Sequence, residues 1–177
     1  WYENNRKSKL VQIAENMLPL NCSSLSDTSL EKLFDLLRKD RSIKMLKGYA
    51  SSLAAVADYF DRQGFTPDLF HLKLIVSGAE RLDPVIKTAL KKVFGCTVVS
   101  RYANNENGVL AQQGLSDDVF HLNTAHYYFE CLQPDHDEPA TFGQPARLVL
   151  TDLYNWATPL IRYDTGDLVI AERMEGK

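Results

Sequence analysis

Residues 72–100 read LKLIVSGAERLDPVIKTALKKVFGCTVVS, and this stretch decides the fold class. Leu72–Val76 is a short run of apolar and β-branched residues around one lysine, and it predicts a buried strand. Asp83 followed by Pro84 predicts the start of a helix, because Asp is a good N-cap and Pro suits the first helical position. Thr97–Ser100 predicts a second strand. Strand, helix and strand in this order favour a βαβ unit with a parallel sheet, so we expect an α/β fold.

The segment before this unit predicts three helices. Apolar residues recur at helical spacing between residues 10 and 17, and again from Thr28 onward. Thr28 and Glu31 match the capping-box pattern, so we expect the second helix to begin there. A third helix is expected over residues 51–63. The N-terminal part of the chain is therefore expected to be rich in helix.

The pattern changes after about Gly114, where short strand-like runs replace helical periodicity. A polar turn over residues 135–142 separates the first two of these runs. We expect two domains: an α/β subdomain over residues 1–114, and a β-rich, antiparallel segment over residues 115–177 that packs on it. The strand-like runs are Phe129–Leu132, Ala146–Thr151 and Asp167–Ala171.

The composition argues against several function classes. The formal net charge is -3 and Lys and Arg form no stripe, so nucleic acid is not an expected partner. The apolar runs are far too short to cross a bilayer, so no membrane partner is expected. The cysteines form no CxxC motif or disulfide framework, which favours a cytoplasmic location. The chain begins at Trp1 and ends at Lys177, and we expect both ends to be cuts inside a longer protein. The sequence does not indicate an oligomeric state.

Ser77–Glu80 is the first segment that could bind a ligand, because it directly follows a predicted strand. In an open parallel sheet, ligands bind beyond the carboxyl ends of the strands. A small residue, Gly and a small residue in this turn let the backbone come close to a flat ligand. The alternative is an ordinary turn between strand and helix.

Arg101–Gly108, with the sequence RYANNENG, is the second segment and follows the next predicted strand. Its Tyr could stack on a base, and its carboxylate could hold Mg²⁺. The alternative is a polar loop with a half-buried Tyr. Both segments are expected at the same edge of the sheet.

Ile161–Leu168, with the sequence IRYDTGDL, is the third segment. Thr165 and Gly166 predict a tight turn between two strand-like runs, which would direct Asp167 back from the start of the second run. A fixed carboxylate facing two vicinal hydroxyls can bind a ribose, because hydrogen bonds to a charged group are the stronger kind. The alternative is a hairpin turn with a structural Asp.

A set of potential zinc ligands recurs every five residues in the β-rich segment. Five residues place successive side chains on opposite faces of a strand and well off one face of a helix. We therefore expect no metal site from this set. It consists of His121, His126, Cys131 and His136.

Three motifs in this order resemble successive core motifs of one family. They are Ser77–Glu80, Tyr102–Glu106 and Arg162–Asp167, and Gly48–Leu53 leading into a helix adds to the likeness. The chain resembles the AMP-binding, adenylate-forming (acyl-CoA synthetase, or ANL) superfamily, and within it the phenylacetate–coenzyme A ligase and CapK-type capsular polysaccharide biosynthesis branch. The resemblance covers roughly residues 48–169, and it implies an ANL-like fold, as a fragment of the large N-terminal AMP-binding domain.

The resemblance assigns four residues to the adenine. It implies that the backbone of Gly78, Ala79 and Glu80 lines the base, and that the ring of Tyr102 stacks on it. The family usually has Gly where Ala103 stands.

The resemblance assigns four more residues to the phosphates, the metal ion and the ribose. Glu106 would be the catalytic residue that holds Mg²⁺ near the phosphates, and Asp167 would bind the ribose hydroxyls. Asn105 stands where the family usually has a Thr or Ser that touches the α-phosphate. Arg162 would contact phosphate or order its own turn.

The function that the resemblance implies is ATP-dependent activation of a small carboxylate, first to acyl-AMP and then by transfer to coenzyme A or another acceptor. Its ligands would be ATP or AMP, Mg²⁺ and the carboxylate. The isolated chain is expected to be inactive, because the family's phosphate loop and its small C-terminal domain would lie beyond the two ends. A non-catalytic nucleotide-sensing module and a partner-binding α/β domain are the alternatives.

Overall fold

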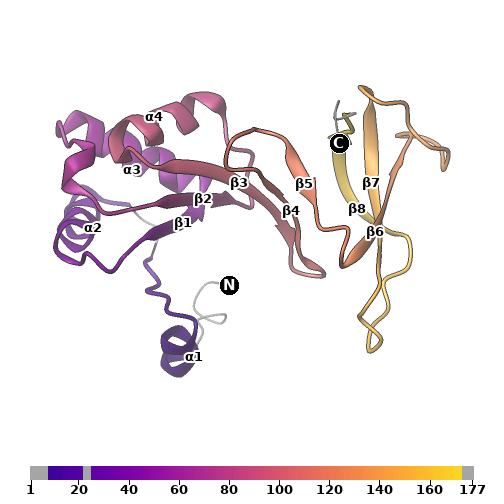
Figure 1. Ribbon diagram of the computed structural model, residues 1–177, viewed down its shortest axis with the longest axis horizontal. Helices are drawn as coiled ribbons and strands as arrows, with labels where there is room; N and C mark the ends of the chain where they lie inside the picture. The colour runs from indigo at the N-terminus through magenta and orange to yellow at the C-terminus, as the bar shows by residue number, and fades with distance from the viewer. Residues whose placement is uncertain (1–7, 22–24, 173–177) are drawn as a thin grey trace. The chain divides into compact units, whose positions relative to one another are not determined.

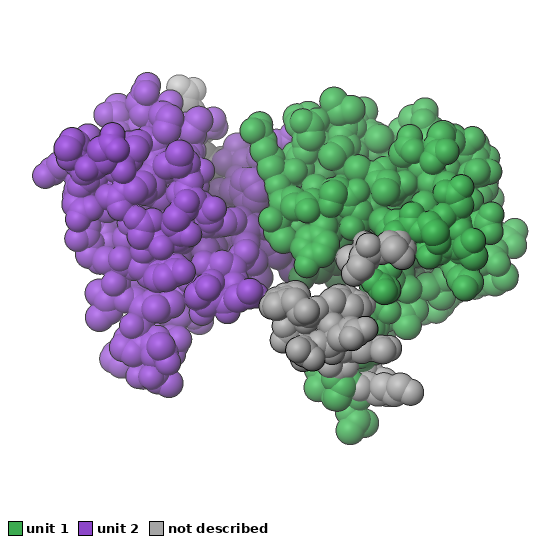
Figure 2. Space-filling model, turned by 180° about the vertical axis from the view of Figure 1, so that it is seen from behind, with its two compact units in different colours: residues 1–98 green, residues 99–177 purple. Residues whose placement is uncertain are grey.

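The computed structural model describes residues 8–21 and 25–172. The chain forms two compact units, residues 1–98 (unit 1) and residues 99–177 (unit 2), which Figure 2 colours separately. The domain boundary expected after residue 114 remains a prediction.

Unit 1 contains all the described helices (Figure 1). β1 and β2 are parallel partners joined by α3, with Met45 opposite Leu74 and Tyr49 opposite Gly78. The α/β fold expected for this part of the chain is therefore confirmed, although this parallel pair contains β1, a strand that the sequence did not predict. The elements are α1 (Lys9–Ala14), α2 (Asp27–Lys39), β1 (Met45–Tyr49), α3 (Ala50–Arg62), the 3₁₀ helix η1 (Pro67–Leu69), β2 (Leu74–Gly78) and α4 (Pro84–Phe94).

The ends of α4 follow from local sequence. The Asp83 side chain accepts a hydrogen bond from the backbone N–H of Val85 at 2.7 Å, and Pro84 occupies the first turn. Gly95 ends the helix in the left-handed conformation, with φ 61°. Both predicted ends of this helix are confirmed.

The start of α2 differs from the prediction. Ser26 caps the helix, because its hydroxyl accepts from the N–H of Ser29 at 3.3 Å. Thr28 lies inside the first turn, so the expected capping box at Thr28 and Glu31 is wrong. Ser and Thr are both good caps, and the sequence alone did not distinguish them.

The core of unit 1 is aromatic. Phe60 is fully buried at its centre and lies within ring contact of Phe34, Phe65, Phe70 and Phe94. These rings come from α2, α3, α4 and the segments between them, so they hold the helices together, and Ile75 of β2 belongs to the same core.

Unit 2 is built from strands. β3 pairs with β4, and β4 with β5, both antiparallel. A separate antiparallel sheet has the order β6-β7-β8, which confirms the expected antiparallel, β-rich C-terminal part. The strands are β3 (Thr97–Asn104), which begins at the end of unit 1, β4 (Gly108–Gln113), β5 (Phe120–Leu122), β6 (Tyr127–Leu132), β7 (Pro145–Asp152) and β8 (Tyr163–Ile170).

Two expected loops are in fact strands. β3 continues to Asn104, so Tyr102 stands on a strand and only residues 105–107 form the turn to β4. β8 begins at Tyr163 and runs through the motif, so Thr165 and Gly166 form no hairpin turn. Both corrections place Tyr102 and Asp167 on strands instead of loops.

Candidate functional site

Asp167 stands in a bulge of β8. Arg147 of β7 pairs with Leu168, and Val149 pairs with Asp164. Between these two pairs β7 supplies Leu148 alone, whereas β8 supplies the three residues 165–167. Gly166 has a φ of 76°, which Gly adopts without a steric penalty. The bulge therefore pushes Asp167 out of the regular strand, as bulges beside functional sites often do.

Hydrogen bonds fix the bulge from within. The Thr165 hydroxyl donates to the backbone carbonyl of Leu148 at 2.9 Å and lies 3.2 Å from the N–H of Asp167, which donates to it. The Asp164 carboxylate accepts from the N–H of Gly166 at 3.0 Å. Backbone and side chains thus set the direction of Asp167 together.

The phenol of Tyr102 meets this carboxylate. Its hydroxyl donates a hydrogen bond to Oδ2 of Asp167 at 2.5 Å. Burial, followed by the hydrogen bond to Asp167, raises the pKa of Tyr102 from 10.0 to about 12. The phenol therefore stays protonated and donating at neutral pH, and β3 and β8 are linked at the point that the sequence motifs indicate.

The ring of Tyr102 rests against a small apolar core of unit 2. That core comprises the buried residues Leu110, Tyr127 and Leu150, with Phe129 and Tyr163 packed against it together with Tyr102 itself. Tyr102 is only partly buried, so part of this residue remains exposed to solvent. A second flat ring can stack on such a supported aromatic at little entropic cost.

The turn after β3 presents Asn105 and Glu106 to solvent. The Asn104 side chain accepts from the N–H of Asn107 at 2.8 Å, and the Tyr127 hydroxyl donates to the Asn107 carbonyl. These two bonds brace the turn on both sides of Glu106. The amide of Asn105 and the carboxylate of Glu106 are thus exposed on an ordered support.

The Gly78–Glu80 segment belongs to unit 1 and begins at Gly78, the last residue of β2. Ala79 has a φ of 64°, an unusual conformation for a residue with a Cβ. The Glu80 carboxylate accepts from the backbone N–H of Ser51 at 2.7 Å and from its hydroxyl at 3.0 Å. Tyr49, the N-cap of α3, makes no capping bond with its side chain, so Glu80 caps that helix from 29 residues away.

Arg162 is already partnered. Its Nε donates to Oε2 of Glu130 at 3.2 Å, and its backbone N–H donates to the Thr151 hydroxyl at 3.0 Å. Its φ of 49° is again left-handed. These contacts fit the second role that the family resemblance implied, ordering the start of the motif.

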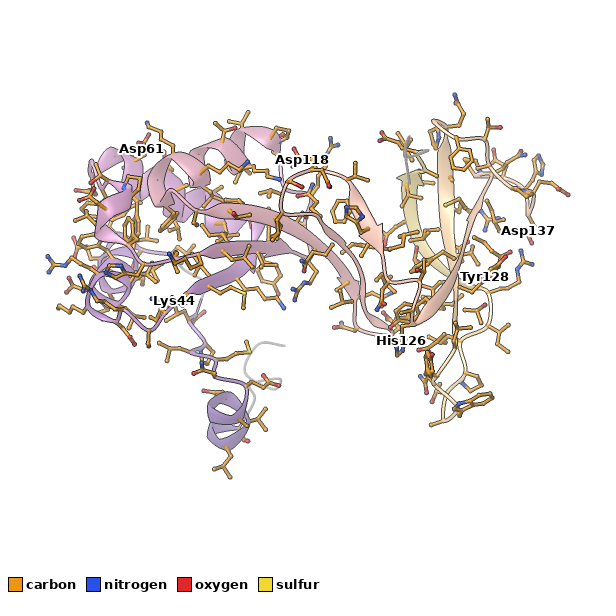
Figure 3. The ribbon with its side chains drawn as sticks, in the orientation of Figure 1. Lys44, Asp61, Asp118, His126, Tyr128 and Asp137 are labelled. Atoms are coloured by element: carbon orange, nitrogen blue, oxygen red, sulfur yellow. The ribbon has the colours of Figure 1, made fainter. Side chains whose placement is uncertain are left out.

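Metal ligands do not gather among the described residues, where no group of three His, Cys, Asp or Glu side chains is placed to hold a metal ion. Two of the recurring histidines have carboxylate neighbours instead. His121 lies 3.2 Å from Asp117, and His126, labelled in Figure 3, lies 3.4 Å from the buried carboxylate of Asp152. Among the described helices, none is long and apolar enough to span a membrane.

Sequence reasoning missed one side chain, Arg147, and one contact of Glu80, a residue that it did single out. Arg147 contacts Asp164 of the bulge, and the Glu80 carboxylate caps α3. Their partners lie 17 and 29 residues away, so no local motif indicates either contact.

Among known proteins, several are similar in sequence to this chain. Phenylacetate–coenzyme A ligase of Thermus thermophilus is 30% identical over 132 residues, which cover 71% of this chain and 28% of that protein. Protein CapK of Staphylococcus aureus is 30% identical over 131 residues, covering 72% of this chain and 26% of CapK. The chain thus spans under a third of the length of these two relatives, and no family model matches it.

Solved structures share the fold. An open conformation of 2-hydroxyisobutyryl-CoA ligase, in complex with 2-HIB-AMP and CoA, matches 83% of this chain and 35% of its own chain. The TM-score is 0.71 at 20% sequence identity. An anthranilate CoA ligase in complex with anthranoyl-AMP matches 87% of this chain with a TM-score of 0.68 at 14% identity.

Proposed function

The chain belongs to the adenylate-forming superfamily, and we propose on that basis that it is the nucleotide-binding part of a ligase that activates a carboxylate with ATP. In the proposed reaction a carboxylate oxygen of the substrate attacks the α-phosphorus of ATP, and pyrophosphate leaves. A nucleophile, for which we propose the thiol of coenzyme A, then attacks the acyl carbon of acyl-AMP, so that a thioester forms and AMP leaves.

The observation that carries the proposal is the bond between Tyr102 and Asp167. A carboxylate has about four lone-pair sites, and one bond from Tyr102 leaves others for the two ribose hydroxyls. The ring of Tyr102, which packs against the small apolar core of unit 2, would stack on adenine. Such stacking contributes about 1–3 kcal/mol, and a hydrogen bond to a charged group about 1.5–3 kcal/mol.

The other candidate residues would contact the phosphates, Mg²⁺ and the base. Glu106 and Asn105 would face the phosphates, with Glu106 the residue that would hold Mg²⁺. That ion would neutralise charge on the phosphate oxygens. The family resemblance also implies that the backbone of Gly78, Ala79 and Glu80, at the end of β2 in unit 1, would line the base.

The proposed ligands are therefore ATP or AMP, Mg²⁺ and a small carboxylate, with coenzyme A as acceptor, and the proposed location is the cytoplasm. The isolated chain is expected to bind nucleotide weakly, because stacking and ribose contacts alone give about 3–6 kcal/mol before the costs of association. A dissociation constant near the millimolar range corresponds to about 4 kcal/mol.

Isothermal calorimetry of this chain with AMP and 2′,3′-dideoxy-AMP tests the proposal. AMP should bind in the millimolar to high micromolar range, and the dideoxy analogue at least about tenfold more weakly. Equal binding of the two nucleotides, or none, would favour a partner-binding domain. Measurable ribose-dependent binding by a whole protein without pyrophosphate exchange would favour a nucleotide sensor.

A further inference from the structure

We propose that Arg147 is a positioning residue for the ribose contact, because it holds the bulge of β8 in the shape that directs Asp167. The inference rests on the proposed function, since it concerns the same site. Arg147 lies outside all three sequence motifs that indicate the nucleotide, and it touches no proposed ligand group itself.

The guanidinium of Arg147 uses all three of its nitrogens. Nη1 donates to Oδ2 of Asp164 at 2.5 Å, and Nη2 to Oδ1 of Asp137 at 2.7 Å. Nε donates to the carbonyl of Gln133 at 3.1 Å, and Nη2 also to that of His136 at 3.2 Å. Asp137, labelled in Figure 3, lies in the turn between β6 and β7, so Arg147 joins that turn to β8.

The link reaches Asp167 in two short steps. One oxygen of Asp164 accepts from Arg147, and the other accepts from the backbone N–H of Gly166. Gly166 is the left-handed residue of the bulge and directly precedes Asp167. The Gly166 N–H and the Arg147 guanidinium both hold the pKa of Asp164 below its ordinary value, so Asp164 is an anion whenever the site is expected to work.

The bulge has a second restraint that does not depend on Arg147. Thr165 bonds to the Leu148 carbonyl and receives the N–H of Asp167. This restraint and the strand pairing should keep the fold when Arg147 is replaced. Replacing Arg147 should instead change the direction of the Asp167 side chain. Without the cation between them, the carboxylates of Asp137 and Asp164 would repel each other and shift the bulge.

A merely structural ion pair would behave differently. The Arg147 side chain is 24% exposed, but its carboxylate partners Asp137 and Asp164 are 72% and 40% exposed, and ion pairs with exposed partners usually contribute little to overall stability. If Arg147 had only a structural role, replacing it would change the unfolding temperature and would lower the affinity for AMP and 2′,3′-dideoxy-AMP equally. A positioning role should weaken the contribution of the ribose hydroxyls in particular.

The test compares AMP with 2′,3′-dideoxy-AMP in the full chain and in four variants: Arg147→Met, Arg147→Lys, Asp164→Asn and the double variant Arg147→Met/Asp164→Asn. Arg62→Met is the matched control, because Arg62 forms an exposed ion pair with Asp58 on α3. Calorimetry gives each affinity, and circular dichroism checks that every variant is folded.

We expect Arg147→Met to lose about tenfold in affinity for AMP and to leave the dideoxy analogue unchanged, since about one charge-assisted hydrogen bond is misdirected. Arg147→Lys should recover part of the preference, and the double variant should lose no more than the more affected single variant. Arg62→Met should match the unmodified chain.

A full ribose preference in Arg147→Met would overturn the inference while the proposed function stands. An equal loss of affinity for AMP and for 2′,3′-dideoxy-AMP in this variant would likewise overturn the inference and leave the proposed function standing. If Arg147→Met fails to fold, Arg147→Lys and Asp164→Asn take its place in the test. Their affinity for AMP is then divided by their affinity for 2′,3′-dideoxy-AMP and compared with the same ratio for the unmodified chain. Absence of any ribose preference in the unmodified chain would overturn the proposed function itself, and this inference with it.

Discussion

The hydroxyl of Tyr102 lies 2.5 Å from Oδ2 of Asp167, although 65 residues separate the two along the chain. One residue stands on β3 and the other in the bulge of β8. Two motifs that are distant in sequence therefore meet at one place in unit 2. An aromatic face and a fixed carboxylate side by side are the parts needed to bind a nucleoside.

Replacing Tyr102 should separate stacking from hydrogen bonding. Tyr102→Phe keeps the ring, so we expect AMP affinity within about threefold of the unmodified chain. Tyr102→Ala removes the ring and should reduce the affinity about tenfold or more, because stacking contributes about 1–3 kcal/mol. Calorimetry with AMP measures both. A larger loss in the Phe variant than in the Ala variant would contradict the stacking role.

The pKa of Tyr102 predicts how stability depends on alkaline pH. Burial and the bond to Asp167 raise this pKa to about 12, whereas in the unfolded chain the phenol titrates near 10.0. The unfolded state therefore releases its proton first, and stability is lost as pH rises from about 10 through about 12. Denaturant unfolding between these pH values should show this loss, and Tyr102→Phe should lose less. If the free energy of unfolding falls equally with pH in the unmodified chain and in Tyr102→Phe, the pKa of Tyr102 is not raised.

Glu80 should stabilise α3 over a long sequence distance. Glu80→Ala removes both acceptors from Ser51 and should destabilise unit 1 by about 1 kcal/mol, the usual contribution of a helix cap. Thermal unfolding followed by circular dichroism measures the change. Because Ser51→Ala keeps the backbone donor, it should cost less. If the Ala variant at position 80 is as stable as the unmodified chain, the cap contributes nothing.

Gly166 should be difficult to replace. A Cβ built there meets no atom within 4 Å, so the expected cost of Gly166→Ala is backbone strain alone, about 1–2 kcal/mol at its left-handed φ. Gly48→Ala is the control, because Gly48 lacks a positive φ and its Cβ would make ordinary contact with Leu53. Chemical denaturation should separate the two variants. Equal costs would mean that φ at Gly166 matters little.

The parts of the fold that depend on local sequence were predictable. Asp83, Pro84 and Gly95 set both ends of α4 by chemistry within a few residues of each end. β1 was missed, because Lys47 and Gly48 at its centre disfavour a strand and only pairing with β2 makes one.

The bulge of β8 was missed for a similar reason. Its sequence fits a tight turn equally well, and the register of β7, in which Leu148 alone faces three residues, decides between them. For the site, the family resemblance assigned Tyr102 to the base and Asp167 to the ribose of one nucleotide, and the two side chains do contact each other. Arg147 was not predictable, since its four partners lie between Gln133 and Asp164 and share no spacing.

The most direct test of the account is a crystal structure of this chain with AMP bound. The account predicts the ribose 2′ and 3′ hydroxyls within hydrogen-bond distance of the Asp167 carboxylate, and the adenine stacked on the ring of Tyr102. AMP bound elsewhere, or with its ribose turned away from Asp167, would contradict it.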